Sequence, residues 1–190
     1  MKKKAKLYFY YSTMNAGKTT SLLQTNNNYK KRNFNTLIFI PKTANTNGII
    51  KSRIGIYEQG KTINTNFNIF NYIKRYNNPK IDIIFIDEVH FLNKKQIFQI
   101  ISIVDHINIP VLTYGLRTDF QSKLFESSKY LLALADKVIE IKTICYCGNK
   151  AIMNLRLNEQ GHKTFKGNQI NTDKTLYTAL CRKHFYKYKK

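Results

Sequence analysis

Several residue types are scarce in this sequence, and each shortage argues against a class of protein. It contains 3 cysteines, 3 prolines, 8 glycines and no tryptophan among 190 residues. Three cysteines cannot all pair with one another, which argues against a disulfide-stabilised secreted protein. There is no proline-rich linker, and no apolar run reaches the roughly 20 residues of a membrane-spanning helix. We therefore expect one cytoplasmic domain with at most a small appendage, and no membrane partner.

Acidic residues are also scarce, with 11 Asp and Glu against 32 Lys and Arg and a net charge of +21. Such an excess is one signature of nucleic-acid binding. Only 6 of the basic residues are arginines, however, and the lysines are spread along the chain among abundant Asn, Ile, Tyr and Phe. This composition is typical of an AT-rich genome. We expect weak, salt-sensitive attraction to polyanions and no specific nucleic-acid partner.

The sequence contains apolar runs that alternate with segments of helical spacing. The runs, rich in Ile, Val, Phe and Tyr, span residues 6–11, 36–40, 81–87, 109–115 and 137–141. Because they are nearly continuous, they predict strands buried on both faces. Segments with helical spacing span residues 19–31, 68–76, 94–107 and 123–135. This order predicts an α/β fold in which a mostly parallel sheet is flanked by helices.

The segment YFYYSTMNAGKTT, residues 8–20, ends as a phosphate-binding loop does. Ser12 stands where the full signature has its first glycine. A strand before the loop and a helix after it direct backbone N–H groups and the helix dipole at an anion. Gly17 permits close approach of phosphates, Lys18 reaches the β- and γ-phosphates, and the Thr19 hydroxyl is a magnesium ligand. The predicted ATP-binding residues of the loop are Ser12, Thr13, Met14, Asn15, Ala16, Gly17, Lys18 and Thr19.

A second motif follows the apolar run IDIIFID, which ends in Asp87 and Glu88. An acidic residue at the carboxyl end of such a strand lies beside the phosphate loop. We expect Asp87 to hold magnesium through water and Glu88 to point to the γ-phosphate as a base. Val89 and His90 complete the segment assigned to ATP. The alternative is a carboxylate pair that only caps the helix after Asn93.

These two motifs predict a P-loop NTPase-like domain over residues 1–142. The letters DEVH at residues 87–90 also spell the D-E-x-H box of helicases. A helicase motor needs two such domains and a longer chain. A small nucleic-acid-stimulated ATPase of helicase-like type is therefore the alternative function.

Two short pairs of metal-binding residues lie near the end of the chain. Cys145 and Cys147 are two residues apart, and Cys181 and His184 are three apart. Two such pairs separated by a loop are typical of tetrahedral zinc sites, although a buried apolar cysteine is the alternative for each one. Because four protein ligands leave no open position, we expect the zinc to be structural. Residues 143–190 are thus predicted to form a small zinc-binding lobe.

Together these motifs resemble thymidine kinases of the small, zinc-containing type, close to those of enteric bacteria. The resemblance covers residues 6–188 and rests on YFYYSTMNAGKTT, IDEVHFL, IPVLTYGLRTDFQSKLF, LALADKVIEIKTICYCGNKA and CRKHF. It implies ATP-dependent phosphorylation of the thymidine 5′-hydroxyl to thymidine monophosphate, a step of nucleoside salvage. In this reaction Glu88 would remove the hydroxyl proton. The resemblance also implies a homotetramer that is restrained by thymidine triphosphate.

A nucleoside pocket is also implied by the resemblance. Carried over to this sequence, its residues are Met14, Leu116, Phe120 and Phe125, with Ile170 and Tyr177 from the family's substrate-binding loop, the lasso. Ordinary core packing is the alternative for Leu116. Three departures stand out: residues 41–48 lack the Asp and Arg of relatives, His90 stands where relatives usually have glutamine, and the lasso lacks a glycine pair. We expect an active enzyme with an altered nucleoside affinity.

Overall fold

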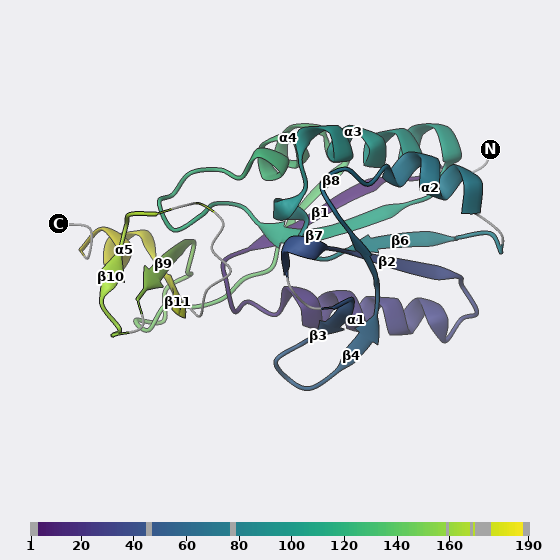
Figure 1. Ribbon diagram of the computed structural model, residues 1–190. Helices are drawn as coiled ribbons and strands as arrows, with labels where there is room; N and C mark the ends of the chain where they lie inside the picture. Colours follow the sequence, from purple (N-terminus) through teal and green to yellow (C-terminus); the bar gives the residue numbers. More distant parts are fainter. Residues whose placement is uncertain are drawn as a thin grey trace.

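A parallel sheet of six strands forms the centre of the computed structural model, which describes residues 4–44, 47–76, 79–158, 160–167, 169 and 176–187 (Figure 1). Neighbouring strands all pair in parallel. In order across the sheet the strands are β5 (Lys61–Ile63), β2 (Thr36–Pro41), β6 (Ile83–Ile86), β7 (Val111–Leu116), β1 (Leu7–Ser12) and β8 (Lys137–Glu140). The predicted α/β class, with a parallel sheet flanked by helices, is confirmed.

Helices cover both faces of this sheet (Figure 1). One face carries α1 (Lys18–Lys30), and the other carries α2 (Ile69–Tyr76), α3 (Lys94–Ser102) and α4 (Glu126–Leu134). Two separate apolar clusters result, one with Leu22 and Leu23 of α1, the other with the apolar faces of the remaining helices. Continuous apolar strands are thus explained by burial on both sides.

The helix predicted over residues 94–107 differs from the observed one in its second half. Asn93 and Gln96 form a capping box, in which each side chain accepts a hydrogen bond from the other residue's backbone N–H. The α-helical part ends at Ser102, and the chain continues as a π-helical turn, η3 (Ile103–Ile107). Apolar spacing does not distinguish these two helix types, since both bury the same side of the segment.

One predicted strand is less buried than expected. Lys137 and Val138 of β8 are exposed, because β8 pairs only with β1 and forms an edge of the sheet. Several short strands, of two to five residues, were not predicted, because they mix polar and apolar side chains without a clear period. Those outside the central sheet form a hairpin of β3 (Ile49–Lys51) and β4 (Tyr57–Gln59), and a second sheet of β9 (Met153–Leu157), β10 (Lys163–Thr164) and β11 (Leu176–Leu180).

The second sheet belongs to a small C-terminal lobe. Its strands are antiparallel, and β9 lies between β10 and β11. Together with α5 (Arg182–Lys187) they enclose a third apolar cluster that includes Leu155, Leu180 and Phe185. The lobe lies beside the loops at one end of the central sheet (Figure 1). A lobe boundary between residues 142 and 143 stays a prediction. Among the helices described, none has the length and apolar character that crossing a membrane requires.

Candidate functional site

The predicted phosphate loop connects the carboxyl end of β1 to the start of α1. Asn15 and Gly17 adopt left-handed backbone conformations, with φ of 62° and 82°. Gly17 occupies the N-cap position of α1, where a residue without a side chain leaves the first N–H groups of the helix available to an anion. The local geometry is therefore that of a phosphate-binding site.

Lys18 is buried inside this loop. Its Nζ donates to Ser12 Oγ at 3.1 Å and to the Thr13 carbonyl at 2.9 Å. Ser12, which replaces the glycine of the signature, thus provides an acceptor for the lysine. Burial lowers the pKa of the Lys18 ammonium group, which an anionic ligand would counteract.

The two acidic residues follow β6 and lie beside the loop, as predicted. Thr19 Oγ1 donates to Asp87 Oδ2 at 2.9 Å. Burial raises the pKa of Asp87, although the Thr19 hydrogen bond opposes this. A hydroxyl and a buried carboxylate in contact supply the hard oxygen ligands that Mg²⁺ prefers, and a cation would stabilise the ionised form of Asp87. The side chains present therefore fit a magnesium ion.

Glu88 has a backbone conformation that is unusual for its residue type. Its φ is 49°, in the left-handed region, which costs about 1–3 kcal/mol unless the surrounding structure holds it. Burial, and then the charge of Asp87, raise the pKa of its carboxyl to about 7. A carboxyl that titrates near neutral pH is suited to act as a general base.

Two cavities meet at Glu88 and Met14, which line both of them. The first, of about 310 Å³, is bounded by loop residues 14–20 and by residues 51–54 of the β3–β4 hairpin. We call it the phosphate cavity. The second, of about 110 Å³, is called the aromatic pocket. Its lining residues are Met14, Glu88, His90, Phe91, Leu116, Asp119, Phe120, Phe125, Asn154, Gln169 and Tyr177.

The aromatic pocket brings together the nucleoside residues that the resemblance implied. Met14, Leu116, Phe120, Phe125 and Tyr177 all line it, although they come from distant parts of the chain. Ile170 lies outside the described residues. The roles of these residues stay predictions, but their convergence beside Glu88 is a feature of the structure.

His90 faces the aromatic pocket. The Leu116 N–H donates to its Nδ1 at 3.3 Å, and its ring lies 4.6 Å from that of Phe125. Burial lowers the pKa of His90 well below its ordinary value, so its contact with Glu88 is not an ion pair. Neither Val89 nor His90 is among the described residues that line the phosphate cavity, and their assignment to ATP stays a prediction.

A glycine of β7 makes this arrangement of His90 possible. A Cβ atom at Gly115 would lie 2.8 Å from Val89 Cγ1 and 3.1 Å from the His90 backbone nitrogen. Both distances are shorter than ordinary contacts, so any larger residue would displace the segment that follows Glu88. The sequence shows the glycine but not the segment that it approaches.

Polar residues of the aromatic pocket were missed by the sequence-based prediction. Asn154 Oδ1 accepts from the Met14 N–H at 2.8 Å, and its Nδ2 donates to the Thr118 carbonyl at 2.9 Å. Asp119 Oδ2 accepts from Gln169 Nε2 at 3.0 Å. These bonds join segments that are far apart in the sequence. Asp119 lies within one of the stretches that carry the resemblance, whereas no signal marked Asn154.

The four predicted zinc ligands come together in the C-terminal lobe. Their ligand atoms all lie within 4.8 Å of one another. His184 Nδ1 is 3.4 Å from the sulfur atoms of Cys145 and Cys181, and the sulfur atoms of Cys147 and Cys181 are 3.9 Å apart. Tetrahedral zinc with Zn–S bonds of about 2.3 Å requires S–S separations of about 3.8 Å. A disulfide would require about 2.0 Å. The cluster therefore fits a zinc ion.

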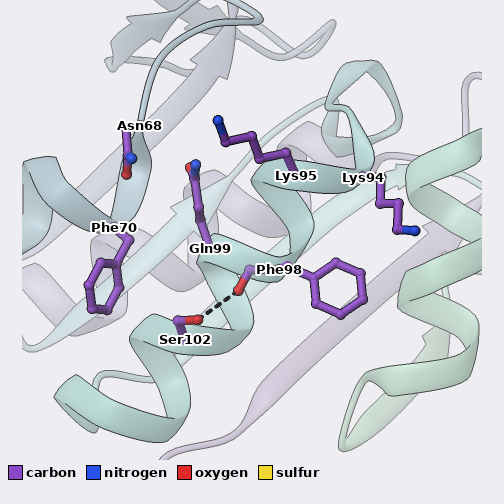
Figure 2. Close-up of a pocket in the computed structure, with 7 residues that line it drawn as sticks. All are labelled: Asn68, Phe70, Lys94, Lys95, Phe98, Gln99 and Ser102. Carbon is purple, nitrogen blue, oxygen red and sulfur yellow. Dashed lines mark hydrogen bonds between the residues drawn. The ribbon is translucent and has the colours of Figure 1, made fainter.

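A wider hollow of about 440 Å³ lies between α2 and α3 (Figure 2). Its lining includes Asn68, Phe70, Lys94 and Phe98. It shares no described residue with the phosphate cavity or the aromatic pocket. None of the predicted site residues lines it, so it is not part of the site described above.

Comparison with known proteins places these features in a family. The family model described as thymidine kinase matches residues 5–185. Thymidine kinase of Mannheimia succiniciproducens is 52% identical over 185 residues, which cover 95% of this chain and 95% of the relative. Thymidine kinase of Blochmanniella floridana is 50% identical over 188 residues, covering 96% and 98%.

Among solved structures, Pif1 helicase from Candida albicans is similar with a TM-score of 0.44 and 14% identity. The match covers 74% of this chain and 36% of the helicase. A similarity this low has no bearing on activity.

Proposed function

Because the chain belongs to the thymidine kinase family, we propose that it transfers the γ-phosphoryl group of ATP to the 5′-hydroxyl of thymidine. The observation that carries this proposal is the position of Glu88, which lines both the phosphate cavity and the aromatic pocket. A catalytic base between the two sites can take the proton from the hydroxyl of a ligand in the aromatic pocket while that hydroxyl attacks the ATP in the phosphate cavity.

The chemical step follows from this position. The thymidine 5′-oxygen attacks the γ-phosphorus and its proton passes to the Glu88 carboxylate. The bond between the γ-phosphorus and the bridging oxygen breaks, and ADP leaves with the electron pair. Lys18 and the first N–H groups of α1 stabilise the charge that develops on the phosphate oxygens. Magnesium, when bound, adds positive charge there, and Thr19 and Asp87 would hold it.

The base of thymidine would occupy the aromatic pocket. The rings of Phe120 and Phe125 and the side chains of Leu116 and Met14 provide apolar surfaces for a flat pyrimidine. The Arg156 guanidinium lies 3.7 Å from the centre of the Phe120 ring, which restricts the orientation of that ring. Tyr177 lines the pocket from β11 of the C-terminal lobe, where it would shield a bound nucleoside from water.

The remaining parts of the proposal concern the setting of the reaction. Zinc has a structural role at Cys145, Cys147, Cys181 and His184. The enzyme acts in the cytoplasm in nucleoside salvage for DNA synthesis, as a homotetramer that thymidine triphosphate restrains. Its partners are thymidine and ATP, without a specific nucleic acid or a membrane.

The proposal is tested by a transfer assay with radiolabelled ATP, magnesium and each common nucleoside in turn. Labelled thymidine monophosphate should form with the wild-type protein. Glu88→Gln keeps the shape of the side chain but removes the base, so turnover should fall by about 10²-fold or more while ATP still binds. Absence of transfer to thymidine by the wild type would refute the proposed function. Near-normal turnover by the variant would refute the role of Glu88.

A further inference from the structure

The β3–β4 hairpin lines the phosphate cavity beside the phosphate loop and Glu88. Its residues 51–54 line the cavity together with loop residues 14–20 and Glu88. The hairpin is short, and no signal in the sequence connected it with nucleotide binding. Residues 51–54 therefore lie where they can contact a ligand bound in the phosphate cavity.

Packing and hydrogen bonds fix the hairpin against α1. Ile50 is 1% exposed and belongs to the apolar cluster that contains Leu22 and Leu23 of α1. At the other strand, the Glu58 carboxylate accepts hydrogen bonds from Lys30 and Asn26, which also lie on α1. Because α1 begins with Lys18 and Thr19, the hairpin and the phosphate-binding residues are attached to the same helix.

A tight turn then presents the residues between the strands. Ser52 is buried and its N–H donates to the Ile56 carbonyl at 2.9 Å, while the Gly55 N–H donates to the Ser52 carbonyl at 3.1 Å. Gly55 has a φ of 94°, a conformation that favours glycine. The neighbours of Ser52 on either side, Lys51 and Arg53, are exposed and line the cavity.

The charges around the cavity are strongly unbalanced. Among the described residues that line it, Lys18, Lys51 and Arg53 are cationic, and Glu88 is the one acid. Burial is the main cause of the lowered pKa of Lys18, and the charge of Arg53 acts in the same direction. Two cations that repel each other across a cavity are stabilised when a polyanion lies between them.

We propose that Arg53 is a catalytic residue that contacts the γ-phosphoryl group of bound ATP from the hairpin side. This inference rests on the proposed function. A guanidinium group is permanently charged and can donate two parallel hydrogen bonds to phosphate oxygens. It makes no covalent bond with the substrate; it stabilises the negative charge as the phosphoryl group passes from ADP to the 5′-oxygen of thymidine. Arginines in this role contribute about 10³–10⁵-fold to turnover in other phosphoryl-transfer enzymes.

The test compares Arg53→Ala and Arg53→Lys with the wild type in the thymidine phosphorylation assay. Arg53→Ala should lower kcat by about 10²-fold or more, with little change in KM for thymidine. Arg53→Lys should recover only part of the loss, since an ammonium group lacks the paired geometry. Low concentrations of guanidinium chloride should partly restore Arg53→Ala but not Glu88→Gln. The matched control is Arg32→Ala, at an exposed arginine beyond the end of α1, which should keep normal activity.

Binding measurements identify the phosphate that Arg53 contacts. Arg53→Ala should lose more affinity for a non-hydrolysable ATP analogue than for ADP, both with magnesium, because only the analogue carries a γ-phosphate. Equal losses for both ligands would overturn the inference, as would a wild-type-like kcat for Arg53→Ala. Thermal unfolding shows whether Arg53→Ala folds; if it does not, Arg53→Lys and Arg53→Gln provide the same comparison. A wild type that does not phosphorylate thymidine would refute the proposed function instead.

Discussion

At the scale of single residues, the site depends on groups whose pKa values are shifted mainly by burial. Lys18 is buried with a lowered pKa, and Asp87 and Glu88 are buried with raised ones. Each of these shifts disfavours the charged form in the unliganded protein. A phosphate chain would oppose the shift of Lys18, and a magnesium ion held by Asp87 would oppose the shift of that carboxyl.

Stability against pH measures this directly for Glu88. A carboxyl whose pKa is about 7 in the folded protein and about 4.3 when unfolded stabilises the fold below pH 4.3. That contribution is lost as the pH rises through 7. Burial lowers the pKa of His90, which changes stability in the opposite direction over this range, so the wild type is compared with Glu88→Gln, both without nucleotide and magnesium and with zinc retained. The difference in free energy of unfolding, wild type minus Glu88→Gln, should fall from pH 5.5 to pH 8, as measured by urea unfolding. Parallel curves for the two proteins would contradict a raised pKa at Glu88.

Asn154 is one of the residues that join the C-terminal lobe to the phosphate loop; Asn15, which donates to the Tyr177 carbonyl, is another. Asn154→Leu has a similar size but leaves the Met14 N–H and the Thr118 carbonyl without their observed partner. An unsatisfied buried polar group costs about 1–3 kcal/mol, and a displaced Thr118 should move Phe120 in the aromatic pocket. We expect urea unfolding to show this loss and KM for thymidine to rise.

The control for Asn154 is Asn28→Leu, on the exposed side of α1, which should change stability by no more than about 0.5 kcal/mol. If Asn154→Leu changes neither stability nor KM for thymidine, the two hydrogen bonds do not couple the lobe to the site.

The site residues that could be predicted from the sequence are those that lie close together in short motifs. Gly17 and Lys18, and the pair Asp87 and Glu88, were identified because strand, loop and helix follow one another within a few residues. The nucleoside residues required a resemblance to a family, because Leu116 and Tyr177 meet only in three dimensions. Arg53 and Asn154 could not be predicted, since their positions depend on how a hairpin and a lobe pack on the phosphate loop.

At the scale of elements, burial on both faces decided which strands could be predicted. The central strands β6 and β7 are buried along their whole length and give continuous apolar runs. Strand β8 has a similar run but exposes Val138, because it lies at the edge of the sheet. The apolar run itself does not indicate whether a strand lies at the centre or at the edge. The strands of the hairpin and of the zinc lobe are short and mixed in polarity, so they left no period to recognise.

The zinc lobe provides the clearest prediction at this scale. Elemental analysis should find about one zinc per chain, as expected for a single site with four ligands. Cys181→Ser removes a predicted zinc ligand directly after β11, which carries Tyr177 and pairs with the strand of Asn154. Thymidine affinity should therefore fall more than ATP affinity, as measured by calorimetry on each ligand.

The matched control for Cys181→Ser is removal of zinc from the wild type with a chelator, which should produce the same pattern of affinities. Metal-free protein with full activity would refute a structural role of zinc.

At the scale of the whole molecule, two distinct cavities meet at one carboxylate. The phosphate cavity is cationic and the aromatic pocket is largely apolar, and they are formed by different parts of the fold. A nucleic-acid motor would need the phosphate cavity but not an apolar pocket beside its catalytic carboxylate. The molecule as a whole therefore favours a small nucleoside over a polynucleotide as the partner of ATP.

The last prediction separates these two functions by what stimulates the release of ADP. With ATP and magnesium alone, hydrolysis should be slow, because water is a poor substitute for a hydroxyl held in line with the γ-phosphate. Thymidine should accelerate ADP formation strongly, with an equal amount of thymidine monophosphate. RNA or single-stranded DNA should bind weakly through the net charge of +21 and dissociate as salt is raised. A coupled ADP assay at two salt concentrations measures both effects. Stimulation by polynucleotide without stimulation by thymidine would make this chain an ATPase of the helicase-like type.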